Sequence, residues 1–235
     1  DLRIIHIAGT NGKGSVSAFL RSVFECAGLK TGMFTSPHLV DFRERIQVQG
    51  DMISKEDTMR LGNRLLSMDF GVYPTMFDYC LAMALLYFKE QKCDVVILET
   101  GLGGTYDSTN ACGVPDVTVI AKIGFDHMAI LGDTLAKIAA EKAGIIKHGT
   151  ALVLESQEKE AMDVLNKAAE RADIKTTKVV NLDEIRILPQ KDGKQCFSYA
   201  GYDAVTMKML GVHQYENAVA AMLAAELFFE KYFAR

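Results

Sequence analysis

The sequence predicts an α/β fold with a doubly wound, mostly parallel sheet, and three observations predict it. Short apolar runs recur along the first two thirds of the chain. Segments with a helical spacing of apolar residues separate these runs. A glycine-rich segment lies between the first run and the first helical segment. Continuous apolar runs are typical of parallel strands buried on both faces, and their alternation with helices is typical of a doubly wound sheet.

The elements of this sheet can be placed in order along the chain. The apolar runs predict strands at Ile4–Ala8, Met33–Thr35, Val95–Leu98, Val117–Ile123 and Ala151–Leu154. Apolar residues from Val16 to Ala27 repeat at i, i+3 and i+4, which indicates a first helix with Gly28 as its C-cap. The same spacing predicts helices near Lys55–Met68, Phe77–Gln91, Leu135–Ala143 and Glu158–Ala172.

The pattern changes after Lys175, where the segments become shorter and more β-rich. Asp192-Gly193 is typical of a hairpin turn, and a final helix is predicted from about Asn217 to Phe233. We therefore predict one domain over residues 1–235, with a small β-rich flank near its C-terminal part. The short strands of the flank are predicted at Lys178–Val180, Ile185–Leu188, Cys196–Tyr199 and Val205–Met209.

Composition excludes several classes of protein. Hydrophobic residues make up 49% and charged residues 24%, values that are typical of a globular domain with a sizeable core. The net charge of −4 argues against a nucleic-acid or membrane-surface binder, since both usually carry a basic excess. The five cysteines include no C-x-x-C pair, and no signal peptide or membrane span is evident. We expect a cytoplasmic monomer with free thiols.

The segment after the first strand has the features of a phosphate-binding loop. Small residues let backbone N–H groups surround phosphate oxygens, and the helix N-terminus adds a favourable dipole. Lys13 supplies a positive charge for the β- and γ-phosphates of ATP. Ile7 replaces the first glycine of the common P-loop pattern, and Gly14 separates Lys13 from the hydroxyl residue. The predicted ATP-binding residues are Gly9, Thr10, Asn11, Gly12, Lys13, Gly14 and Ser15.

Polar residues follow three of the predicted strands. Ligands bind beyond the C-terminal ends of the strands in open α/β sheets. We therefore expect Ser36, Glu99 and His127 to gather beside the phosphate-binding loop. Oxygen-rich ligands combined with nucleotide phosphates suit Mg²⁺. Glu99 could instead cap a helix, and His127 could be a partly buried histidine with a structural partner.

Several motifs occur in order along nearly the whole chain, at His6–Ser15, Thr35–Leu39, Glu44–Ile46, Glu99–Asn110, Asp126-His127, Leu131-Gly132, Glu141–Ile145, His213-Gln214 and Asn217-Ala218. Together they resemble the folylpolyglutamate synthase/dihydrofolate synthase family of Mur-type ligases. The resemblance implies an enzyme that phosphorylates a folate or dihydropteroate carboxylate with ATP and then forms an amide with L-glutamate. Thr105, Tyr106 and Asp78 depart from the usual family pattern, which leaves the preferred pteridine substrate open.

The resemblance also implies roles for individual residues. Lys142 matches the family lysine that is carbamylated by CO₂, so its cation becomes an anion that supports a second magnesium ion. Potassium is a further candidate cofactor. The implied catalytic residues are Lys13, Glu99, His127 and carbamylated Lys142, and the implied magnesium ligands are Ser36, Glu99 and His127. The segment that meets adenine matches His213, Gln214 and Asn217, which we expect just before the last helix, and Phe42, Arg43 and Arg45 are candidates for the pterin side.

Alternative interpretations remain. A cell-wall amino-acid ligase of the Mur type is disfavoured by the Thr-Ser-Pro-His-Leu and Glu-Arg-Ile elements. A nucleotide-binding module without ligase activity is disfavoured by the retention of Lys13, Glu99, His127 and Lys142. A P-loop GTPase lacks support because no Asn-Lys-x-Asp segment is present. The chain begins on a strand without an initiator Met, so we expect a piece of a longer protein whose C-terminal Rossmann-like domain binds glutamate.

Overall fold

The computed structural model describes residues 2–233 and contains one large sheet. Its eight strands have the order β4-β3-β2-β5-β1-β6-β7-β8. The six strands from β2 to β8 in this order are parallel, and β3 and β4 extend the sheet with antiparallel pairings. The doubly wound, mostly parallel sheet is therefore confirmed. The strands are β1 (Ile4–Ala8), β2 (Thr31–Phe34), β3 (Ile46–Val48), β4 (Asp51–Met52), β5 (Val95–Glu99), β6 (Val117–Ile120), β7 (Ala151–Leu154) and β8 (Thr177–Val179).

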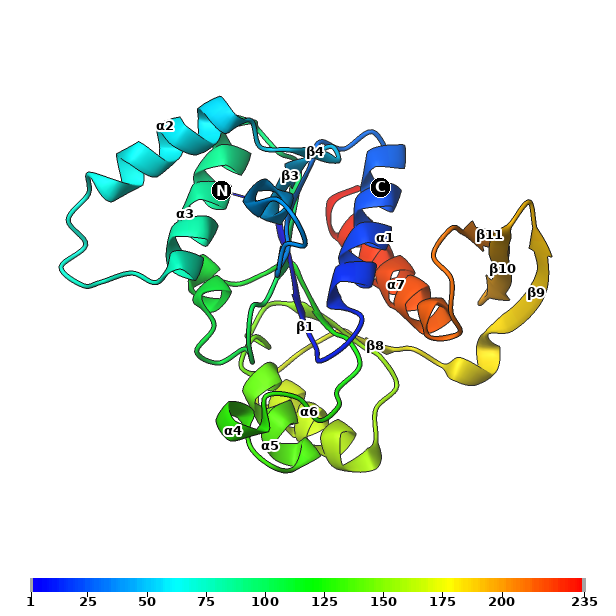
Figure 1. The fold of residues 1–235 in the computed structure, drawn as a ribbon. Helices are drawn as coiled ribbons and strands as arrows, with labels where there is room; N and C mark the ends of the chain where they lie inside the picture. The colour runs from blue at the N-terminus through cyan, green and yellow to red at the C-terminus, as the bar shows by residue number, and fades with distance from the viewer. Residues whose placement is uncertain (1, 234–235) are drawn as a thin grey trace.

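Helices cover both faces of this sheet (Figure 1). Successive residues of a strand point to opposite faces. Ile5 and Ile7 of β1 therefore pack with α1 and α7, whereas Ile4 and Ala8 pack with the helices of the other face. On that second face, α2 and α3 cover one half of the sheet, and α5 and α6 cover the other. The helices are α1 (Lys13–Cys26), α2 (Lys55–Leu66), α3 (Met76–Glu90), α4 (Met128–Leu131), α5 (Leu135–Ala143), α6 (Lys159–Arg171) and α7 (His213–Phe233).

The packing of α1 against α7 fixes the first helix beside the last. Phe24 of α1 lies with its ring centroid 5.0 Å from Phe228 and 5.6 Å from Phe229 of α7. Phe24 and Phe228 are fully buried, so the two helices share one apolar interface. This contact brings the start of α7 to the loop that follows β1.

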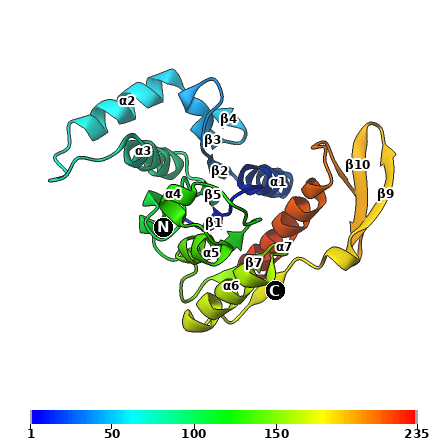
Figure 2. The same cartoon turned by 60° about the horizontal axis from the view of Figure 1, so that its bottom comes forward.

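A small antiparallel sheet forms the predicted flank. It contains β9 (Arg186–Lys191), β10 (Lys194–Tyr199) and β11 (Tyr202–Met207) in the order β11-β10-β9. Asp192 and Gly193 have φ angles of 51° and 71°, as the hairpin turn requires. Figure 2 shows the hairpin to one side of α7, and Phe197 packs on Tyr215 of that helix with centroids 5.6 Å apart.

Some predicted boundaries were wrong. The strand predicted at Lys178–Val180 is β8, which pairs parallel with β7 at the edge of the large sheet rather than joining the flank. The last helix begins at His213 rather than near Asn217. Strands β3 and β4 were not predicted because they span three and two residues, too few to show a pattern. Of the five free cysteines, Cys80 and Cys196 are buried, whereas Cys26 is exposed. Among residues 2–233, none of the helices has the length and hydropathy that a membrane crossing requires.

Candidate nucleotide and metal site

The glycine-rich loop connects the end of β1 to the first turn of α1. Its backbone is anchored to the segment after β6, because the N–H groups of Thr10 and Asn11 donate to the carbonyl oxygen of Lys122 at 2.8 and 3.1 Å. The hydroxyl of Thr10 also donates to the carbonyl oxygen of Gly124 at 3.0 Å and accepts from its N–H at 3.1 Å. Two neighbouring strand ends therefore hold the loop in one shape.

Gly12 can only be glycine in this loop. Its φ is +86°, in the left-handed region, and a Cβ atom would lie 2.3 Å from Oδ1 of Asn217. Gly12 is also the N-cap of α1 and offers no side-chain hydrogen bond to the first turn. In contrast, the hydroxyls of Ser54, Thr75 and Thr134 cap α2, α3 and α5. The first-turn N–H groups of α1 thus lack a side-chain cap, which suits a site for phosphate oxygens.

Two lysines meet at one carbonyl group of the loop. Nζ of Lys13 lies 3.1 Å from the carbonyl oxygen of Gly9, and Nζ of Lys142 lies 3.0 Å from the same oxygen. Lys142 comes from α5 and is only 3% exposed, although a lysine on a helix is usually solvated. Burial, together with the positive charge of Lys13, lowers the pKa of Lys142 to about 8. A substantial fraction of this amine is therefore neutral near pH 7–8.

Glu99 ends β5 and faces the same loop. Its Oε1 lies 3.9 Å from Nζ of Lys13, and its Oε2 accepts from the N–H of Ser36 at 3.3 Å. Burial raises the pKa of Glu99 to about 7, while Lys13 and the Ser36 N–H oppose the shift. The carboxylate and the nearby Ser36 hydroxyl are hard oxygen donors that fit Mg²⁺. Within residues 2–233 no group of three or more acidic, histidine or cysteine side chains is placed to hold a metal ion.

His127 does not join this group in the structure. It precedes α4 with a left-handed φ of 47°, and its side chain is 56% exposed. Its Nε2 lies 3.6 Å from Oδ2 of Asp126, rather than beside Glu99. The strand-end rule correctly places His127 at this edge of the sheet, but the left-handed turn directs its imidazole toward Asp126 and solvent. Its assignment as a metal ligand stays a prediction.

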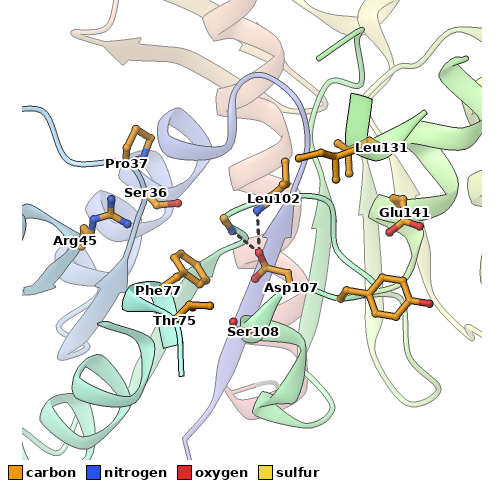
Figure 3. Close-up of a pocket in the computed structure, with 13 residues that line it drawn as sticks. Ser36, Pro37, Arg45, Thr75, Phe77, Leu102, Asp107, Ser108, Leu131 and Glu141 are labelled. Carbon is orange, nitrogen blue, oxygen red and sulfur yellow. Dashed lines mark hydrogen bonds between the residues drawn. The ribbon is translucent and has the colours of Figure 1, made fainter. Parts of the chain in front are cut away.

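A cavity of about 660 Å³ opens beside Ser36. Figure 3 shows Ser36 and Arg45 on one side of it and Leu131 and Glu141 on the other. Asp107 accepts from the N–H groups of Gly101 and Leu102, both at 2.8 Å, and so fixes the loop after β5. This cavity has room for a small organic substrate, and Ser36, which lines it, connects it to the loop through Glu99.

Of the three residues predicted for the pterin side, Arg45 lines this cavity. Its Nε donates to Nδ1 of His38 at 2.8 Å. Phe42 instead packs against the core between α2 and α3, and Arg43 forms an ion pair with Asp41 at 2.7 Å. The 3₁₀ turn Phe42–Arg45 therefore directs its side chains to different places. Sequence reasoning missed Phe77, Leu131 and Glu141 in the lining, although Leu131 and Glu141 both lie within recognised motifs.

A second cavity, of about 460 Å³, lies on the other side of the loop. Asn11 of the loop lines it together with His213 and Asn217 at the start of α7. Gln214 is buried, and its Oε1 accepts from Nδ2 of Asn217 at 2.9 Å. The predicted adenine residues thus lie in the first turns of α7 and not before it. Sequence reasoning missed Lys122, Glu155 and Glu216, which also line this cavity.

Comparison with known proteins explains this arrangement. The sequence pattern of the Mur ligase middle domain matches residues 7–225, nearly the whole chain. The chain belongs to the Mur ligase family. The fold and the motifs from which the resemblance was inferred agree with this Mur ligase assignment.

Individual relatives in the Mur ligase family are similar along the whole chain. The dihydrofolate synthase/folylpolyglutamate synthase of Bacillus subtilis is 42% identical over 96% of this chain and 55% of its own length. Mycobacterium tuberculosis folylpolyglutamate synthase complexed with ADP and AMPPCP superposes with a TM-score of 0.88, at 34% identity, over 97% of this chain and 55% of that one. An FPGS–AMPPCP–folate complex has a TM-score of 0.85, with 28% identity, over 98% of this chain and 59% of that one. The chain spans a little over half the length of these relatives.

Proposed function

We propose that residues 1–235 form the ATP-binding unit of a ligase that joins a folate or dihydropteroate carboxylate to the amino group of L-glutamate. The names of the relatives and the Mur ligase assignment support this function. The observation that carries it is the convergence of Lys13, Glu99 and Lys142 on the phosphate-binding loop, with Ser36 between Glu99 and a cavity of about 660 Å³. ATP would bind at the loop and the pteridine substrate in that cavity.

In the proposed reaction, the substrate carboxylate attacks the γ-phosphorus of ATP, and ADP leaves. The glutamate amine then attacks the acyl phosphate, and phosphate leaves. The uncapped first turn of α1 and Lys13 would hold the phosphates in line with the carboxylate. Magnesium, when bound, would neutralise phosphate charge, held by Ser36 and Glu99.

Lys142 is the proposed site of carbamylation. Its neutral amine would form a C–N bond to CO₂ and lose a proton, which yields an anionic carbamate. The lowered pKa of Lys142 supports this step because the neutral amine is the reactive form. The resulting anion would lie close to Lys13, since both side chains contact the carbonyl oxygen of Gly9. A second magnesium ion beside it and a potassium ion complete the proposed set of cofactors.

We also propose where glutamate binds and where in the cell the protein acts. Glutamate would be bound by a further C-terminal domain of the Rossmann type. The partners would be small molecules alone, and the protein would act as a cytoplasmic monomer. The acidic net charge and the free cysteines support this setting.

Calorimetric titration with Mg–ATP tests the nucleotide site. Lys13→Ala removes a charge-assisted contact worth roughly 1.5–3 kcal/mol, so the Kd should rise about tenfold or more. Lys137→Ala is the matched control, because that lysine is exposed on α5 and pairs with Asp133. Equal affinities of Lys13→Ala and the control would remove Lys13 from the site. Mass spectrometry of full-length protein incubated with ATP, L-glutamate and either folate or dihydropteroate would test the ligase reaction itself.

A further inference from the structure

A buried carboxyl group lies beyond the phosphate-binding loop, on the side away from the 660 Å³ cavity. Glu155 directly follows β7, and β7 is separated from β1 only by β6. Two strand spacings amount to about 10 Å. Glu155 and Asn11 of the loop line the same cavity of about 460 Å³. A nucleotide whose phosphates lie at the loop can therefore place its base in this cavity.

Glu155 lines this cavity with a side chain that has an unpaired hydrogen-bonding atom within residues 2–233. It is only 1% exposed, and its Oε1 has no hydrogen-bond partner among the described residues. Its neighbours are engaged: Nζ of Lys122 donates to the carbonyl oxygen of Ser156 at 2.6 Å, and Glu216 Oε1 accepts from the Ser156 N–H at 2.7 Å. Buried polar atoms in native proteins are nearly always hydrogen-bonded, so this atom indicates a ligand.

The chemistry of the group narrows the choice of ligand. Burial and the nearby charge of Glu216 raise the pKa of Glu155 to about 8, while the backbone N–H and the charge of Lys122 oppose the shift, so the neutral carboxylic acid is favoured at pH 7. A carboxylic acid offers an O–H donor and a C=O acceptor side by side. Adenine offers the complementary pair, an amino group next to a ring nitrogen that accepts. A metal cation fits poorly, because Lys122 lines the same cavity and the carboxyl group is neutral.

We propose that Glu155 accepts a hydrogen bond from the 6-amino group of adenine and so helps to select ATP as the nucleotide. This assignment rests on the proposed function, in which ATP binds at the loop. The O–H of the same carboxyl group donates to the adjacent ring nitrogen. On the base edge that carries N7, adenine offers an acceptor and a donor, whereas guanine offers two acceptors, N7 and O6, and cannot donate this hydrogen bond.

The test compares Mg–ATP with the magnesium complex of purine riboside triphosphate, which lacks only the 6-amino group. Wild-type protein should bind ATP roughly three- to tenfold more tightly than the analogue, as one net hydrogen bond provides. In Glu155→Leu the two ligands should bind within about twofold of each other. Glu155→Gln should keep most of the preference, because an amide has a donor and an acceptor where the acid has them.

Two controls separate the possible failures. Glu155→Leu should stay folded, with an unfolding temperature close to that of the wild type, and its affinity for the analogue should fall only by the hydrogen bond to the ring nitrogen, which ATP and the analogue share. If ATP binds in a Lys13-dependent manner but wild type and Glu155→Leu show the same preference for the amino group, the role of Glu155 is overturned and the proposed function stands. If wild-type protein binds neither nucleotide, both proposals fail.

Discussion

The ends of β5 and β7 place two similar carboxyl groups in different surroundings. Glu99 and Glu155 both lie where a parallel strand ends, and both are almost fully buried. Burial raises the pKa of Glu99 to about 7 and that of Glu155 to about 8. Each has a lysine nearby, Lys13 at Glu99 and Lys122 at Glu155, but only Glu155 also has a like charge, that of Glu216, and an Oε1 without a partner among the described residues.

The difference shows that the strand end supplies the position and the neighbouring side chains supply the chemistry. A cation next to Glu99 favours the charged carboxylate, which suits a group that holds magnesium. A like charge next to Glu155 favours the neutral acid, which suits a group that pairs with an uncharged base. Burial raises the pKa of both carboxyl groups, and the like charge of Glu216 favours the neutral form further at Glu155 than at Glu99.

The largest expected effect is a loss of ligase activity when Lys142, the neighbour of Lys13, is replaced. Lys142→Ala should lower ligase activity of the full-length protein by about 10²-fold or more, because it removes the proposed carbamate anion. Short carboxylic acids such as acetate should restore part of the activity. Lys137→Ala, on the exposed side of the same helix, is the control. Wild-type activity of Lys142→Ala would show that the carbamate has no role.

Magnesium dependence should distinguish the two carboxyl groups directly. Glu99→Gln keeps the shape of the side chain but loses the anion, so the magnesium concentration for half-maximal ATP binding should rise roughly 10- to 100-fold. Glu155→Gln should leave that concentration unchanged. Calorimetry over a magnesium series would measure both variants. An equal shift in both variants, or none in Glu99→Gln, would remove the distinction between the two strand ends.

The smallest expected effect is on the pH dependence of the free energy of unfolding, measured without any ligand. The pKa of Glu155 is raised from 4.5 to about 8 in the folded state, so the stability linked to its neutral form is present below about pH 4.5 and is lost as pH rises toward 8. Between these pH values, the free energy of unfolding of the wild type should fall with pH more steeply than that of Glu155→Gln, because the amide cannot titrate. The difference in slope should be on the order of 1 kcal/mol per pH unit. Urea unfolding at pH 5.5, 6.5 and 7.5 would show it. Parallel stability profiles would mean that Glu155 is already ionised.

The position of Glu99 at the end of β5 was predictable because it depends only on the apolar run that precedes it. The apolar run Val95–Leu98 indicated a strand, so Glu99 had to lie at the edge that also carries the loop. The burial of Lys142 was not predictable from helical spacing, because it depends on a contact with Gly9 in a distant segment. The cavity at Glu155 was missed for the same reason, as β7, α7 and the loop each contribute to it. The direction of the His127 side chain depends on one left-handed residue, which no periodicity records.

The contact between Gly12 and Asn217 also constrains how this sequence can vary over evolutionary time. The left-handed backbone at Gly12 and the adjacent Oδ1 of Asn217 exclude a side chain at the first position. A bulkier residue at position 217 would push the loop out of shape without touching a phosphate. Substitutions at these two positions are therefore not independent, and drift at the start of the last helix is limited by a loop near the beginning of the chain. The set of side chains tolerated at position 217 would therefore show how much space the phosphate-binding loop leaves beside Gly12.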